Sequence, residues 1–175
     1  MASESDLKRA REGDGWLLEA DLSGADLKGI DLSGACLDDA DLSGAKLSNA
    51  TLYEANLESC NLRNAVLKNV DLRFANLEGA ILSGADLRGA DLRYARLVDA
   101  EFDGADLRDT NLSDAIVYEI HFSGTTGGFD PFRQVDISRV ARFLPEPKSW
   151  VKTADLSGAI LTGATMPDGK QYKAD

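Results

Sequence analysis

From Ala20 to Gly124 the chain reads ADLSG ADLKG IDLSG ACLDD ADLSG AKLSN ATLYE ANLES CNLRN AVLKN VDLRF ANLEG AILSG ADLRG ADLRY ARLVD AEFDG ADLRD TNLSD AIVYE IHFSG. These 105 residues divide into 21 blocks of five without a gap. The third place of a block is Leu in 18 of them, and the first place is Ala in 16. The other three places are mostly polar, so each block carries two apolar positions.

A period of five matches neither a regular helix nor a flat strand. On an α-helix five residues advance by about 500°, so successive leucines would be spread around all sides. On a flat strand the side chains alternate with a period of two, so every second leucine would point outward. Only a backbone that bends once per block keeps all leucines on one side. We therefore expect places one and three to face inward, place two to face outward, and places four and five to form a corner.

The fifth place of the block has the composition of a tight turn. It is Gly in nine blocks and Asn or Asp in seven, and these residues tolerate a positive φ. The remaining fifth places are Glu54, Ser59, Phe74, Tyr94 and Glu119. For these corners we expect a turn that uses only negative φ angles.

Tandem blocks of the form A(D/N)LXX resemble those of the pentapeptide-repeat proteins. The resemblance covers residues 20–124 and also the blocks ADLSG AILTG ATMPD at 154–168. It implies an all-β fold, a right-handed quadrilateral parallel β-helix with four blocks per coil and the third-place residue at the centre of each face. The closing stretch ATMPDGKQY is similar to the C-terminal ends of small cyanobacterial members of the family.

Residues 1–15 precede the repeat and predict a short helical cap. The helix should run through Asp6–Glu12, with Ser3 or Ser5 as its N-cap residue and Gly13 at its end. Such a cap would cover the open edge of the first coil. The chain as a whole divides into an N-terminal helical cap 1–15, a β-helix 16–124, an insertion 125–153, final repeats 154–168 and a C-terminal tail 169–175.

The insertion 125–153 breaks the period of five. Its apolar residues near 136–144 have helical spacing, and Pro145 ends that pattern, so we expect a short helix there. Two roles remain open for the insertion. It either packs on the rod as a cap, which we favour, or serves as a recognition element.

Composition and charge exclude several classes of function. The net charge of -11 argues against direct binding to nucleic acid, which requires a basic surface. Two cysteines and one histidine leave little material for a metal site or for acid–base catalysis at neutral pH. Cys36 occupies an outward place and Cys60 an inward one, so we expect no disulfide, and His121 stands alone. We expect no enzyme, no cofactor and no metal.

The same features predict where the protein acts and in what state. Reduced cysteines are typical of the cytoplasm. The chain has no apolar run of about 18 residues, and MASESDLKRAREGDG at its start has no apolar segment of a secretory signal. We therefore expect a cytoplasmic protein without membrane contact. The tail after Gly169 is too short for a dimerisation helix, so we expect a monomer.

One cluster of outward residues stands out as a candidate contact patch. Tyr53, Phe74 and Tyr94 lie at outward places of consecutive coils, beside Arg73 and Arg93. Exposed aromatic residues with arginine have the composition of binding hot spots. The alternative is an aromatic stack within the rod, supported by cation–π contacts. We favour this alternative because neighbouring side chains on paired strands usually satisfy each other.

The expected function is a non-catalytic protein–protein interaction scaffold whose protein partner is unidentified. The family resemblance offers an alternative, since some pentapeptide-repeat proteins are DNA mimics that bind DNA gyrase and other type II topoisomerases. The most acidic face carries Asp38, Asp39, Glu58, Glu78, Asp99 and Glu119 against Arg96. With coils about 4.8 Å apart, this face has about one net charge per 5 Å, whereas duplex DNA has one per ~1.7 Å. The lower density favours an ordinary solvated surface over a mimic.

Overall fold

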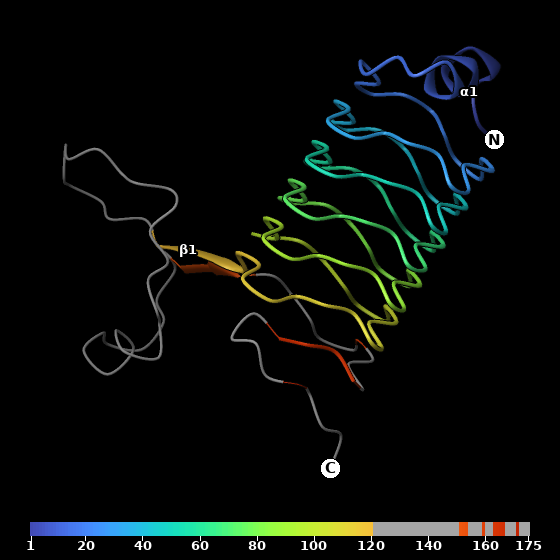
Figure 1. Ribbon diagram of the computed structural model, residues 1–175. Helices are drawn as coiled ribbons and strands as arrows, with labels where there is room; N and C mark the ends of the chain where they lie inside the picture. The colour runs from blue at the N-terminus through green and yellow to red at the C-terminus, as the bar shows by residue number, and fades with distance from the viewer. Residues whose placement is uncertain (121–150, 154–158, 160–162, 167–170, 172–175) are drawn as a thin grey trace, which may run out of the picture.

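The computed structural model of the chain describes residues 1–120, 151–153, 159, 163–166 and 171. The regular elements in these ranges are helix α1, Glu4–Arg11, and strands β1, Tyr118–Ile120, and β2, Val151–Thr153. Between α1 and β1 the chain winds into an elongated stack of similar layers, with α1 at one end (Figure 1). No helix in the described ranges is long and apolar enough to span a bilayer.

The layers are joined by parallel β-bridges between residues twenty positions apart. These bridges run without a break from Trp16–Cys36 to Arg96–Ile116, and each joins the second place of a block to the same place one layer on. The third-place leucines also form hydrogen bonds to the next layer, as when Leu22 N–H donates to the Asp41 carbonyl at 2.8 Å. Each twenty-residue layer therefore contains four blocks and four corners, as expected. The pairing is one residue wide on each side of a layer instead of forming long strands.

The inside of the rod is a column of aliphatic side chains. Every third-place residue from Leu22 to Leu112 is at most 3% exposed, which confirms the expected inward places. The two buried polar groups of this column have partners: the Cys60 thiol donates to the Ala40 carbonyl at 3.1 Å, and the Thr110 hydroxyl donates to the Leu87 carbonyl at 2.8 Å. Cys36 is partly exposed and both cysteines are free, so their outward and inward placement is also confirmed.

The corners of the layers differ from the expectation at several fifth places. Glu54, Ser59, Phe74 and Tyr94 have φ angles of 56°, 56°, 61° and 61°, so the expected turns with only negative φ are wrong there. The cause is the pairing between layers. The fifth-place N–H donates to a fourth-place carbonyl of the next layer, as Phe74 does to Arg93 at 3.1 Å. Equal layers need equal corners to align these groups, so the stack imposes one conformation on every residue type.

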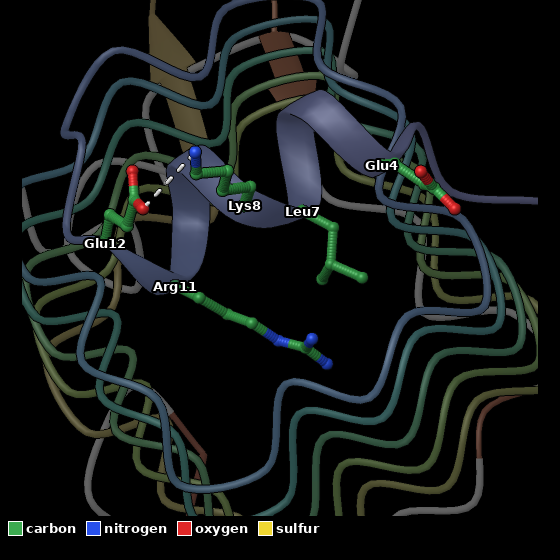
Figure 2. Close-up of a pocket in the computed structure, with 5 residues that line it drawn as sticks. All are labelled: Glu4, Leu7, Lys8, Arg11 and Glu12. Atoms are coloured by element: carbon green, nitrogen blue, oxygen red, sulfur yellow. Dashed lines mark ion pairs between the residues drawn. The ribbon is translucent and has the colours of Figure 1, made fainter.

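Helix α1 closes the N-terminal end of the rod. Ser3 is its N-cap residue and accepts a hydrogen bond from Asp6 N–H at 3.4 Å, and the chain turns away at Gly13, whose φ is 79°. The helix thus begins two residues earlier than the sequence predicts. Ala10 is buried and Leu7 is partly buried against the core. Seen along the rod axis, α1 lies across the mouth of the first layer (Figure 2).

The segment around α1 also satisfies backbone groups at the edge of the first layer. Ala2 N–H donates to the Ser23 carbonyl at 2.9 Å, and Ser3 N–H donates to the Asp21 carbonyl at 2.8 Å. The Asp6 carboxylate accepts a hydrogen bond from Asp21 N–H at 3.2 Å. Free N–H and C=O groups at a sheet edge favour pairing with another chain. The cap therefore protects this side of the layer against association.

The chain leaves the stack at Tyr118. Strand β1 pairs with β2 in antiparallel orientation, with Tyr118 opposite Thr153 and Ile120 opposite Val151, and the two strands extend away from the rod (Figure 1). The repeat pattern predicts a corner at Tyr118–Glu119, so the structure differs from the sequence expectation at this block. Glu119 consequently forms no corner. His121 and the helix expected near 136–144 lie outside the described residues.

The last block rejoins the stack beyond the insertion. Thr165 forms a parallel bridge with Asn111. Leu112 N–H donates to the Thr165 carbonyl at 2.7 Å, and Thr165 N–H donates to the Thr110 carbonyl at 2.8 Å. Ala164 is completely buried. These residues therefore occupy the layer after Asn111 in the orientation that the repeat requires.

Candidate protein-contact site

Three aromatic side chains meet at one corner of three consecutive layers. The rings of Phe74 and Tyr94 stack with their centroids 4.9 Å apart and their planes 12° from parallel. Tyr53 contacts Phe74 edge-on, with centroids 5.6 Å apart and an angle of 69°. The repeat explains the stack, because Phe74 and Tyr94 occupy the same place one layer apart. The layer spacing of about 4.8 Å lies within the range of aromatic stacking.

The two arginines beside the rings are held by aspartates two residues before them. Arg73 Nε and Nη2 donate to the two carboxylate oxygens of Asp71 at 2.8 and 2.7 Å, and Arg93 binds Asp91 in the same way at 2.9 and 2.7 Å. The hydrogen bond from Arg73 lowers the pKa of Asp71. The Arg73 guanidinium also lies 5.3 Å from the centre of the Tyr53 ring, in cation–π geometry. The bidentate bonds therefore hold both arginine side chains in place.

The aromatic stack remains half exposed. The exposed fractions of Phe74 and Tyr94 are 48% and 45%, while Tyr53 is partly buried. A hydrogen bond between Tyr53 and Glu54 raises the pKa of the tyrosine. The rings thus stack on each other and still present surface to solvent, so the stack and the contact patch are compatible. All five residues of the contact patch lie together at this corner.

Sequence reasoning missed two further exposed apolar residues. Trp16 and Leu18 have exposed fractions of 72% and 52%, at the outward second and fourth places of the block Gly15–Glu19. Second and fourth places lie on the outside of the layer, so the repeat pattern alone could have predicted that both residues are exposed. The pairing of Asp71 and Asp91 with arginine was also missed. The tripeptide Asp-Leu-Arg signals it, because places two and four both lie on the outside of the layer.

The most acidic side of the rod, called the acidic face below, consists of blocks 15–19, 35–39, 55–59, 75–79 and 95–99. Amide groups run along its centre, where Asn56 donates to the Asp38 carboxylate. Arg96 Nε and Glu78 Oε2 form an ion pair on this face at 2.8 Å. Among the residues that the structure describes, Asp38 has no cationic partner. The acidic face therefore retains most of its negative charge.

A shallow recess of about 420 Å³ lies beside α1 at the end of the rod. Its lining residues are Glu4, Leu7, Lys8, Arg11 and Glu12 (Figure 2). Lys8 and Glu12 form an ion pair at 3.8 Å. Because all of these residues come from one helix and its end, the recess brings no groups together from different elements. No group of three or more His, Cys, Asp or Glu residues within the described ranges is arranged to hold a metal ion.

Comparison with known families gives one match over most of the repeat. The family model described as "Pentapeptide repeats (8 copies)" matches residues 17–52, 45–84 and 85–124. No curated protein matches the chain. These matched ranges contain the contact patch and nearly all of the acidic face.

Similar solved structures include one plant protein and two cyanobacterial proteins. A pentapeptide repeat protein from the thylakoid lumen of Arabidopsis thaliana is 30% identical, with a TM-score of 0.58, over 65% of this chain and 77% of that one. Rfr23 from the cyanobacterium Cyanothece 51142 is 30% identical, with a TM-score of 0.52, over 64% of this chain and 86% of that one. HetL, involved in heterocyst differentiation regulation in Nostoc sp. strain PCC 7120, is 32% identical, with a TM-score of 0.49, over 90% of this chain and 68% of that one.

Proposed function

The chain belongs to the pentapeptide-repeat family, and from this premise we propose that it is a non-catalytic scaffold for protein–protein contact. The observation that supports the proposal is the half-exposed stack of Phe74 and Tyr94. The proposal includes the right-handed quadrilateral β-helix that the family implies. It also includes a monomer that acts in the cytoplasm without cofactor or metal.

The rigidity of the contact patch favours a binding role. Binding normally costs about 0.5–1.5 kcal/mol for each flexible side chain that becomes fixed. Here the rings are already fixed by each other, and Arg73 is fixed by Asp71 and Tyr53. A partner could therefore bury the exposed edges of Phe74 and Tyr94 without ordering them first.

The titratable groups of the rod support the absence of catalysis. Carboxylates at second places are used in hydrogen bonds to fourth-place side chains, as in Asp31 with Ser33 and Asp106 with Arg108. These bonds lower the pKa of Asp31 and of Asp106. A general base near neutral pH needs the opposite shift.

The alternative function, a DNA mimic directed at a type II topoisomerase, has weaker support. A mimic needs a dense row of charges, and Arg96 neutralises Glu78 within the acidic face. Neutral Asn56 and Asn76 occupy the centre of that face. A gyrase supercoiling assay tests this alternative. Inhibition by the protein would support the mimic, and unchanged supercoiling would eliminate it.

Site-specific cross-linking tests the scaffold. Benzoylphenylalanine replaces Tyr94 in one variant and Ser48, a fourth-place residue on another side of the rod, in a control. Both proteins are irradiated in an extract of the source organism. We expect a discrete cross-linked product from position 94 that is absent from position 48 and is lost when Phe74→Asn is added. The same products from both positions, or none from either, would overturn the proposal.

A further inference from the structure

The exposed large apolar residues of the described chain, apart from Met1, border a single side of the rod. Trp16 and Leu18 are part of the first block of the acidic face, and Phe74 and Tyr94 lie at the corner where the chain enters that face. The rod has four sides, and a solvated surface would spread such residues among them. Trp16 and Arg96 are four layers apart in one column, so this surface is roughly 19 Å long.

Exposed carboxylates surround these apolar side chains. Glu19, Asp39, Glu54 and Glu58 are exposed, and none of them forms an ion pair with another residue in the described ranges. Glu19 follows Leu18 directly, and Glu54 occupies the same column as Phe74, one layer before it. The surface thus combines apolar anchors with uncompensated negative charge.

The acidic face has a definite end on the C-terminal side. Val98 is completely buried, although it occupies the same fourth place as the exposed Leu18, four layers on. Tyr118, at the next equivalent position of the column, begins β1. The available surface is therefore the part of the acidic face from Trp16 to the layer of Tyr94.

Charge selects the kind of partner that this surface fits. A second copy of the chain would bring two acidic faces together, and juxtaposed like charges are unfavourable. Nucleic acid and anionic membranes are repelled for the same reason. A segment with Lys or Arg for the carboxylates and apolar side chains for the aromatic anchors complements both features.

We infer that the acidic face, from Trp16 to the layer of Tyr94, binds a basic segment of a partner protein. The segment contacts the exposed apolar residues at the border of this face, called the apolar rim, which are Trp16, Leu18, Phe74 and Tyr94. This inference rests on the proposed scaffold function and names the chemistry of the partner. The apolar residues supply the buried contacts, and the carboxylates orient the segment and accelerate its association.

Three labelled peptides serve as probes in a fluorescence anisotropy titration of the full-length protein. The first alternates Lys and Leu, the second replaces Lys with Glu, and the third replaces Leu with Ser. We expect the Lys/Leu peptide to bind about tenfold more tightly than either of the others, because it alone satisfies both the carboxylates and the apolar rim. Its affinity should fall as salt is raised.

Variants of the protein locate the binding surface. The apolar variant carries Trp16→Asn and Phe74→Asn. The repeat itself uses asparagine at second and fifth places, so the layers still fold. The charge variant carries Asp39→Asn and Glu58→Gln. We expect each to weaken binding of the Lys/Leu peptide about fivefold or more.

A matched control carries Glu101→Gln and Asp103→Asn, two exposed carboxylates on another side of the rod. We expect it to bind like the unchanged protein. Equal weakening by the charge variant and the control would overturn the inference, because the peptide would then respond only to total charge. Equal binding of the Glu/Leu peptide would also overturn it. Neither result affects the cross-linking at position 94, which tests the scaffold separately.

Discussion

Every non-glycine residue with a positive φ in the described chain occupies the fifth place of a block. Most are Asn or Asp, which adopt this conformation readily, but Ser59 and Phe74 are not. An L-residue in the left-handed region is strained by about 1–2 kcal/mol because its Cβ approaches the following carbonyl. The hydrogen bonds between layers hold these residues in place. The strain at each of these corners is therefore offset by the hydrogen bonds of the whole stack.

Relief of this strain is testable at Ser59. Its φ is 56°, so Ser59→Gly should raise the free energy of unfolding by about 1 kcal/mol, since glycine has no Cβ to clash. Urea denaturation measures the change. Ser48→Gly is the matched control at a fourth place without a positive φ, and it should lower stability by about 0.5–1 kcal/mol. A loss of stability in both variants would contradict the strain.

The sequence predicts the presence of these corners but not their conformation. The composition of the fifth place identifies a turn, because Gly, Asn and Asp dominate it. At Glu54 and Tyr94 the local preference of the residue suggests a negative φ, and the structure has the opposite. The deciding force is the alignment of N–H groups with the neighbouring layers, which is a property of the stack and not of the local segment.

At the scale of structural elements, ion pairs link neighbouring layers on the outside of the rod. Asp86 accepts hydrogen bonds from Arg88 Nε and Nη2, both at 2.8 Å, and lies 3.2 Å from Lys68 Nζ in the preceding layer. Arg88 also lies 3.5 Å from Asp106 in the next layer. Single surface ion pairs contribute about 0–1 kcal/mol. Bidentate geometry repeated from layer to layer makes the series more effective than isolated pairs.

The pH dependence of stability reports on this series. Hydrogen bonds from Arg88, and then the contact with Lys68, lower the pKa of Asp86 to about 2, below the unfolded value of about 3.9. The carboxylate therefore stabilises the fold fully above the unfolded pKa, and this stabilisation is lost as pH falls through the folded pKa.

Asp86→Asn removes this contribution and keeps a residue that the repeat uses at second places. Urea unfolding between pH 5 and pH ~2 should show a smaller loss of stability for the variant than for the unchanged protein. Asp103→Asn, at an exposed carboxylate, should leave the profile as it is. Identical profiles for the Asp86 variant and the unchanged protein would contradict the role of this ion pair.

The elements themselves differ in how well the sequence predicts them. Helix α1 follows from local signals, because the N-cap Ser3 and the terminal Gly13 are close in the chain. The contact patch also follows from the repeat, which places Phe74 and Tyr94 in one column. Strand β1 does not, because AIVYE fits the repeat and its pairing partner β2 lies beyond the insertion. Pairing between distant segments leaves no trace in the local pattern.

For the whole molecule, the layers keep their alignment across the insertion. Thr165 pairs with Asn111, and the distance in sequence exceeds the repeat of twenty by 34 residues, the length of the segment from Ile120 to Thr153. Strands β1 and β2 bring the two ends of this segment side by side. The described residues before and after this segment therefore keep the order of the layers.

Deletion of residues 120–153 tests this behaviour. The shortened chain joins Glu119 to Ala154 and restores an unbroken repeat, so it should fold cooperatively with a midpoint close to that of the full chain. Circular dichroism during heating measures the midpoint. Deletion of 120–152 leaves one residue too many and turns the side chains of the last blocks to the wrong side, so it should unfold earlier. Equal midpoints for the two deletions would contradict the alignment.

The hydrogen bonds between layers all point along the rod, as the bond from Leu22 to Asp41 illustrates. A force that pulls the two ends apart therefore loads the outermost layer first instead of sharing the load among all layers. Under tension the protein should peel open in equal steps. Each step releases twenty residues, or roughly 70 Å of extended chain. The alignment of hydrogen bonds along the rod makes its layers regular, and the same alignment makes the rod unfold under tension from its ends.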